Sequence, residues 1–200
     1  SPGTNGSLTA NSSKHGTGIG SSGNSDLSPA FHIIIKGGAV TASSFRSMGI
    51  GGNNSNITIK GGLVKVSSDQ WCAIGGTKSN ITIDGGSVKA SSVSGSPKND
   101  QDEVYCCTIN NPDSLKVKVD GSPWTPVNHT NVEPNNTNLY AWLTEAEHII
   151  TVGTEERKYS FNNKQFSRIK TDPTADQFVF TQPNFTYNKD NPVNISKYIK

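Results

Sequence analysis

Two copies of one 24-residue segment follow each other without a gap, and this repeat constrains the fold more than any other feature. Residues 39–62 read AVTASSFRSMGIGGNNSNITIKGG, and residues 63–86 read LVKVSSDQWCAIGGTKSNITIDGG. Each copy contains short alternating runs of β-branched residues between glycine-rich corners, which is typical of strands and turns. A fixed period of this length is typical of folds in which repeats stack on one another. The repeat therefore predicts an all-β chain in which each copy is one coil of a parallel β-helix.

The repeat continues on both sides of these two copies. Val88 opens a third copy, which carries an insertion of ten residues around SGSPKNDQDE, resumes at Tyr105 and is completed by residues 117–121. An earlier copy begins at Leu8 and ends with the run at residues 33–38. We therefore expect about four coils over residues 7–121.

The alternation within each run predicts which side chains face the core. In NITIKGG, Ile57 and Ile59 point to one side of the strand, and Thr58 and Lys60 point to the other. Stacking at about 4.8 Å turns each inward position into a column of equivalent side chains. The predicted columns are Ile33, Ile57, Ile81 and Val117; Ile35, Ile59, Ile83 and Val119; Leu8, Val40, Val64 and Val88; and Ile19, Ile50 and Ile74.

The three cysteines are predicted to be structural thiols. Cys72 occupies the position in its repeat that Met48 occupies in the preceding one and should stack on it inside the column, and Cys106 aligns with Cys72 one coil further on. A vicinal disulfide between Cys106 and Cys107, or a bridge from Cys72 to Cys106, is an alternative. No histidine lies at ligand spacing from a cysteine, so the pattern does not favour a metal site.

After Gly121 the period is lost. Short alternating runs at residues 139–143, 148–153 and 157–161 are separated by turn-sized gaps, which predicts an antiparallel meander over residues 122–169. An open end of stacked coils exposes a sheet edge, and we expect this meander to cap it. Residues 170–200 are expected to be a linker and a partial β-module or tail.

Three groups of motifs resemble those of one class of proteins. The repeats of the form GGxVxASS, GIGG and NITIxGG are similar to those of adhesin-like cell-surface proteins of gut bacteria of the Firmicute type, some of which are labelled as containing carbohydrate-binding domains. LYAWLTEAEHIITVG (139–153) and FVFTQPNFTYN (178–188) resemble the small β-module and the first strands of an Ig-like repeat that follow in those proteins. The resemblance covers roughly residues 7–190 and implies a fragment of a larger extracellular protein at the cell surface. It implies no catalytic residues.

The chemistry of the sequence favours a protein that is not an enzyme. Parallel β-helices include polysaccharide lyases and hydrolases, whose sites need clustered carboxylates or a basic residue beside them. Before Asp100 the repeats hold only Asp26, Asp69 and Asp84. Asp84 and Asp120 are expected to stack on neighbouring coils, either as solvated turn residues or as a hint of a site. The four histidines are scattered.

Charge and hydropathy exclude two classes of partner. The formal net charge is +2, which is too small to favour nucleic acid, and no apolar run approaches the length of a membrane span. We expect no cofactor and no metal. Partners are expected to be glycans or surface proteins of a host or of bacteria.

Carbohydrate binding is the main alternative to a structural or adhesive role. Aromatic rings stack on the faces of sugars, and the candidates are Phe45 and Trp71 at a corner of the repeat and Tyr140 and Trp142 on one face of a meander strand. For Tyr140 and Trp142 the favoured interpretation is that they form the core of the cap, packed against the last coil. A weaker alternative is a lyase-like enzyme whose acids lie in the insertion, at Asp100, Asp102 and Glu103.

Overall fold

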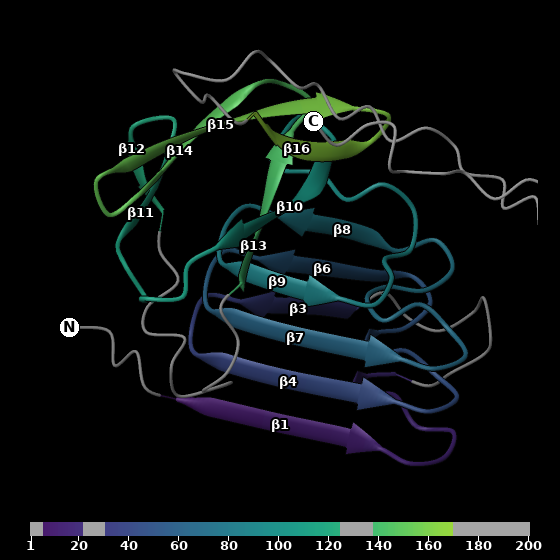
Figure 1. Cartoon of the computed structure of the whole chain (residues 1–200). Coiled ribbons are helices and arrows are strands. Elements are labelled where there is room, and N and C mark those ends of the chain that lie inside the picture. The colour runs from purple at the N-terminus through teal and green to yellow at the C-terminus, as the bar shows by residue number, and fades with distance from the viewer. Residues whose placement is uncertain (1–5, 22–30, 125–137, 170–200) are drawn as a thin grey trace, which may run out of the picture. The chain divides into compact units, whose positions relative to one another are not determined.

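The computed structural model describes residues 6–21, 31–124 and 138–169 (Figure 1). Within these ranges the chain forms β-strands and no helix, so the prediction of an all-β protein is confirmed. The first strands are β1 (Ser7–Ser12), β2 (Ile19–Gly20), β3 (Phe31–Ile35), β4 (Ala39–Ser44), β5 (Ile50–Gly51), β6 (Ser55–Ile59), β7 (Leu63–Ser68), β8 (Asn80–Ile83) and β9 (Ser87–Ala90). They are followed by β10 (Val104–Asn110), β11 (Val117–Val119), β12 (Ser122–Trp124), β13 (Asn138–Thr144), β14 (His148–Val152), β15 (Glu155–Asn162) and β16 (Gln165–Ile169).

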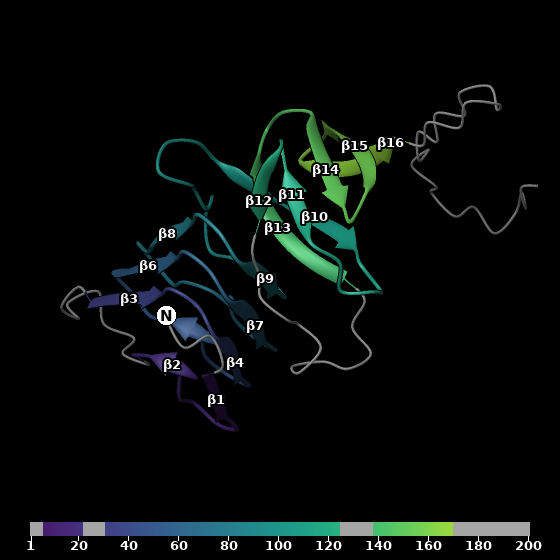
Figure 2. The same cartoon turned by 90° about the vertical axis from the view of Figure 1, so that its left-hand side faces the viewer.

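The strands of the repeats form three parallel sheets. Their orders are β1-β4-β7-β9, β3-β6-β8 and β2-β5, and Figures 1 and 2 show strands of successive repeats lying side by side. Val40 pairs with Val64 and Val64 with Val88, while Ile57 pairs with Ile81. Each of these partners lies one full repeat further along the chain. Equivalent residues of successive repeats are therefore neighbours in space.

Most residues of the apolar columns predicted for the repeats form one core. Ile57, Ile59, Val64 and Ile74 are at most 2 % exposed, and they pack together with the other inward aliphatic residues of the parallel sheets. Leu8 pairs with Val40 as predicted but is 51 % exposed, because β1 is the edge strand of its sheet. The core is thus best covered around the two ideal repeats.

The corners of the repeat need glycine for two reasons. Gly38, Gly62 and Gly86 occupy equivalent positions and have φ angles of 78°, 89° and 76°, which favour glycine over residues with a side chain. A Cβ atom at Gly62 would also lie 2.5 Å from the carbonyl oxygen of Gly38. The neighbouring backbone thus occupies the space that a side chain would need.

Polar side chains also stack from one repeat to the next. The Oγ atoms of Ser55 and Ser79 lie 3.0 Å apart, and each lies 2.8 Å from the carbonyl oxygen of Gly52. On the outside, Asn80 Nδ2 donates a hydrogen bond of 2.9 Å to Asn56 Oδ1. The buried hydroxyl of Ser55 is thereby satisfied within the stack.

The prediction for the third copy of the repeat is wrong after Ala90. Val93 forms a parallel bridge with Ile74, and Lys98 forms one with Thr82, so the residues interpreted as an insertion continue the parallel pairing. Residues 93–98 thus provide the parallel partners of Ile74 and Thr82. The stretches around Tyr105 and residues 117–121 are therefore free to pair elsewhere.

Val117 and Val119 do not extend the inward columns. They pair antiparallel with Val152 and Ile150 of β14, and β10 pairs antiparallel with β13. Their similarity to the repeat is one of local alternation, which does not determine the pairing partner.

The meander is antiparallel as predicted, but its strand order differs. β14, β15 and β16 follow one another in a five-stranded sheet of order β12-β11-β14-β15-β16, whereas β13 belongs to the sheet with β10. These two sheets enclose a second core, formed by Cys107, Ile109, Val117, Leu139, Ala141, Ile150, Val152 and Tyr159.

The chain divides into two compact units, Ser1–Ile169 and Lys170–Lys200. The second unit, with the predicted partial β-module, lies outside the described residues.

Candidate functional site

The four aromatic residues predicted to bind sugar lie in two different settings. Phe45 and Trp71 follow β4 and β7, and the in-register pairing of Ser44 with Ser68 brings the two corners next to each other. These two residues are 42 % and 58 % exposed. The residue equivalent to Trp71 in the preceding repeat is Ser47, which is buried, so the indole ring has no counterpart there.

Trp71 has a defined backbone contact, and Phe45 has a defined side-chain contact. Trp71 N donates to Ser68 Oγ at 3.1 Å, and the guanidinium carbon of Arg46 lies 5.7 Å from the centre of the Phe45 ring. A serine hydroxyl that binds the backbone three residues later stabilises a tight turn. The corner thus presents one indole ring to solvent on an ordered backbone.

Tyr140 and Trp142 face the parallel sheets. Trp142 Nε1 donates a hydrogen bond of 2.9 Å to the carbonyl oxygen of Val88, and Tyr140 N donates one of 2.9 Å to Ser87 Oγ. The Lys89 ammonium lies 5.5 Å from the centre of the Tyr140 ring. Trp142 packs against the core of the parallel sheets. The structure therefore places this strand face at the packing interface rather than on open surface.

A groove that the sequence did not predict lies beside β10, β15 and β16. It has a volume of about 340 Å³ and opens to solvent. Its lining residues are Cys106, Thr108, Asn110, Asn138, Arg157, Tyr159, Lys164, Gln165, Phe166 and Arg168. Three of these residues are cationic, and none is a carboxylate. They come from separate strands whose pairing the sequence did not reveal, although the basic residues between positions 157 and 168 were a visible signal.

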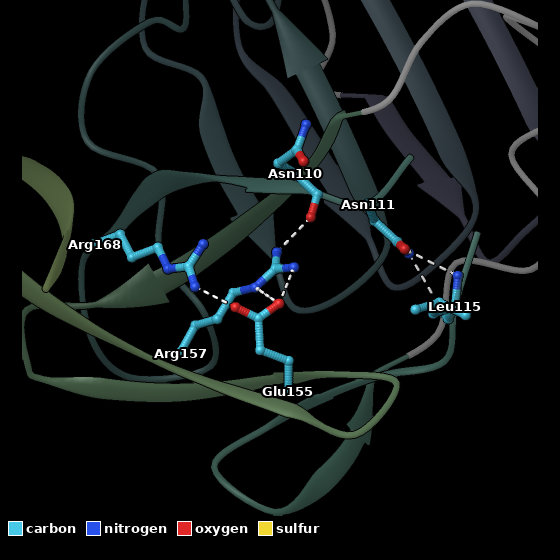
Figure 3. A network of polar contacts seen from close by, with 6 residues as sticks. All are labelled: Asn110, Asn111, Leu115, Glu155, Arg157 and Arg168. Atoms are coloured by element: carbon cyan, nitrogen blue, oxygen red, sulfur yellow. Dashed lines mark hydrogen bonds and ion pairs between the residues drawn. The ribbon is translucent and has the colours of Figure 1, made fainter. Parts of the chain in front are cut away.

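Two arginines of the groove are held by one carboxylate (Figure 3). Arg157 donates from Nε and Nη2 to Glu155 Oε2 at 2.9 and 2.6 Å, and its Nη1 donates to the carbonyl oxygen of Asn110 at 2.5 Å. Arg168 Nη2 donates to Glu155 Oε1. The hydrogen bond from Arg157, together with Arg168, lowers the pKa of Glu155 below its ordinary value of 4.5. Arg157 and Arg168 are thereby fixed in orientation.

The cysteine predictions are partly wrong. Met48 is buried as expected, but Cys72 is only partly buried and Cys106 is exposed, because β10 does not continue the repeat. Cys107 is the fully buried thiol, and all three cysteines are free, so neither disulfide alternative is present. Desolvation raises the pKa of Cys107, the buried thiol, to about 12.

Asp84 and Asp120 do not stack as neighbouring like charges. Asp120 follows β11, and its Oδ2 lies 2.7 Å from His148 Nδ1 while its Oδ1 accepts from Ile149 N at 2.9 Å. His148 Nε2 lies 3.1 Å from the carbonyl oxygen of Thr144. This pair joins β11 to β14, which is a structural role.

Of the acidic residues between β9 and β10, Asp100 and Asp102 lie exposed in a tight turn, and Glu103 accepts a side-chain hydrogen bond. Asn99 Oδ1 accepts from the backbone N–H groups of Gln101 and Asp102 at 2.9 and 2.8 Å, which forms a tight turn. Glu103 Oε2 accepts from the Tyr105 hydroxyl at 2.9 Å, and this bond is the main cause that lowers the pKa of Glu103.

In the part of the chain that the structure describes, no three His, Cys, Asp or Glu side chains gather as they would around a metal ion. The same residues contain no helix with the length and apolar character to cross a bilayer. Comparisons with models of protein families, with curated proteins and with solved structures find no match.

Proposed function

We propose that this chain is a non-enzymatic structural or adhesive module of a bacterial cell-surface protein, built as a parallel β-helix that is capped by antiparallel sheets. The observation that carries the proposal is the in-register pairing of identical or similar residues one repeat apart, as in Ile57 with Ile81 and Val64 with Val88. The extracellular location and the adhesin-like role are supported by the resemblance of the GIGG and NITIxGG motifs.

Stacked repeats suit a spacer for a physical reason. Each repeat contacts only its neighbours, so the length and the stability of the stack grow with the number of repeats. Hydrogen bonds run along the stack from strand to strand, which makes such a rod stiff. A stiff rod holds a binding surface away from the cell.

The cap fits the same proposal. An exposed strand at the end of a stack would pair with other chains. Trp142 of β13 packs on the core beside β9 and donates to Val88, so the C-terminal end of the stack is covered. A covered end keeps the module from aggregating through that end.

Carbohydrate binding at Trp71 and Phe45 is the second candidate function. The specific observation in its favour is the exposure of both rings at adjacent corners, where an apolar ring face is available to a sugar. The lyase-like alternative has weaker support, because Glu103 is bound to Tyr105 and Asn99 organises the turn that carries Asp102.

One experiment tests the β-helix and another separates the functions. Duplicating residues 63–86 should give a folded protein that is longer by about 4.8 Å and at least as stable, whereas inserting only residues 63–74 should disrupt folding. If both insertions unfold the chain, the stacked architecture is wrong.

A glycan array separates the candidate functions. The structural role predicts no binding that depends on Trp71 or Phe45. Binding that is lost in Trp71→Ala and Phe45→Ala would establish the carbohydrate-binding function instead. Depolymerisation of a polysaccharide that is lost in Glu103→Gln would contradict both and support an enzyme.

A further inference from the structure

The groove beside β10, β15 and β16 is lined by three cationic side chains, which packing of the antiparallel sheets alone does not require. We propose that it binds a carboxylated sugar, such as a uronic acid residue of an acidic polysaccharide, with Arg168 and Lys164 as the groups that recognise the carboxylate. This site is separate from the exposed corner at Trp71.

The charge of the groove selects for an anion. Arg157, Lys164 and Arg168 line it, whereas no lining residue is acidic. Glu155 binds both arginines and neutralises one of these charges. The charge of Glu103 also interacts with that of Lys164. One positive charge still remains in excess, and it attracts a negatively charged group.

Arg168 is prepared to bind a carboxylate. One of its N–H groups is bound to Glu155, which fixes the guanidinium, and its side chain is 43 % exposed. A guanidinium has five N–H donors, so one bond to Glu155 leaves donors for a ligand. A fixed guanidinium loses little conformational entropy when it binds.

Lys164 supplies a second cation from a tight hairpin. It lies between β15 and β16, next to Asn163, and the two residues have φ angles of 61° and 49°. Two successive residues with positive φ are typical of a two-residue type I′ turn. The Lys164 side chain is exposed and lines the same groove as Arg168.

The rest of the lining favours a sugar over an acidic peptide. Phe166, which is partly buried, offers ring surface beside the amide of Gln165 and the hydroxyl of Thr108. Sugars present apolar ring faces and hydroxyl groups together, which rings and amides bind together. The groove, at about 340 Å³, lies at the lower end of the size range of small-molecule sites, which suits one or two sugar rings.

The test is calorimetric titration of the whole chain with three probes: trigalacturonate, its methyl ester and hexaglutamate. Trigalacturonate should bind, and its ester, which has no charge, should bind at least about tenfold more weakly because charge-assisted hydrogen bonds are lost. Absence of heat with trigalacturonate, equal affinity for the ester, or equal affinity for hexaglutamate would each overturn the proposal.

Matched variants locate the site. Arg168→Gln and Lys164→Asn should each weaken trigalacturonate binding about tenfold. Asn adopts positive φ readily, so Lys164→Asn should keep the hairpin and an unchanged melting temperature. Lys78→Asn is the control, because it removes one lysine at φ 57° in a turn of the repeats, where the preceding repeat has Asn54, far from the groove in sequence.

Two further variants, Lys78→Asn and Trp71→Ala, show whether trigalacturonate binds in the groove or at the Trp71 corner. Lys78→Asn and Trp71→Ala should leave the affinity for trigalacturonate unchanged. If Trp71→Ala abolishes binding while Arg168→Gln and Lys164→Asn do not, the acidic sugar binds at the corner and the groove proposal is wrong.

Discussion

The indole nitrogen of Trp142 donates a hydrogen bond to the backbone carbonyl of Val88, across 54 residues of sequence. Val88 belongs to the last strand of the four-stranded parallel sheet, and Trp142 belongs to an antiparallel pair of strands. The same ring also packs against the core of the parallel sheets. One side chain thus joins the two kinds of sheet by both apolar contact and a hydrogen bond.

Replacing Trp142 should destabilise the protein in two steps. Trp142→Phe keeps a ring but leaves the Val88 carbonyl without its donor, which should cost about 1 kcal/mol. Trp142→Ala also removes the packed ring and should cost about 3 kcal/mol. Urea unfolding followed by circular dichroism measures both. Trp71→Ala is the control, since an exposed side chain should change the free energy of unfolding by less than about 0.5 kcal/mol.

Gly62→Ala should be strongly destabilising, because the new Cβ meets the Gly38 carbonyl at 2.5 Å and the φ angle is 89°. We expect a loss of about 2 kcal/mol or more in the free energy of unfolding. Gly37→Ala, in the glycine pair of the preceding corner but at the position equivalent to Gly61, is the control, since a Cβ there meets no atom within 4 Å. Equal melting temperatures for the two variants would contradict the close packing of adjacent corners.

The Glu155 carboxylate should stabilise the cap in a pH-dependent way. Its pKa is lower in the folded state than its ordinary value of 4.5, so the folded state binds fewer protons. The stabilisation is therefore present above about pH 4.5 and is lost as the pH falls through the lowered pKa. Glu155→Gln should lower the melting temperature at pH 7, and the difference from the native chain should shrink as the pH falls below 4.5.

Thermal denaturation at several pH values measures this effect. Glu156→Gln, an exposed neighbour on the same strand, is the control for removal of one charge and should have the smaller effect at pH 7. A constant difference between the native chain and Glu155→Gln from pH 7 to pH 3 would show that the ion pairs with Arg157 and Arg168 do not stabilise the fold.

Cys106 and Cys107 should differ in their reaction with iodoacetamide, because Cys106 is exposed and Cys107 is buried. Cys106 should be alkylated in the folded protein, because reagent and solvent reach its thiol. Cys107, which is buried and has a pKa of about 12, should react only after unfolding. Mass spectrometry of timed samples follows both residues, and rapid labelling of Cys107 in the folded protein would contradict the second core.

The repeat made much of the N-terminal half predictable. Its fixed period predicted the register of Ile57 with Ile81 and of Val40 with Val64, because alternation fixes the face and glycine corners fix the length. The exposure of Leu8 was not predictable from the same rule, since it depends on whether another strand covers β1. Position within the stack, and not sequence, decides that exposure.

The C-terminal half was harder to predict because its pairing is not periodic. The alternation of residues 117–119 matched the repeat, yet these residues pair with β14. The groove was missed for the same reason: Cys106, Arg157 and Arg168 share a surface only because β10 lies beside β16, and short-range patterns hold no information on that neighbourhood. The alternation of residues 139–143 predicted one buried face of this strand, whereas the structure buries both, with Leu139 in one core and Trp142 packed against the other.

The stacking of equivalent residues is tested most directly by nuclear Overhauser effects between isoleucine methyl groups in a methyl-labelled sample. The account predicts strong cross-peaks between Ile57 and Ile81 and between Ile59 and Ile83, which are neighbours on adjacent parallel strands. It predicts none from Ile57 to Ile150, which lies in the second core. Absence of the cross-peak between Ile57 and Ile81 in the folded protein would contradict the stacked repeats and the function proposed from them.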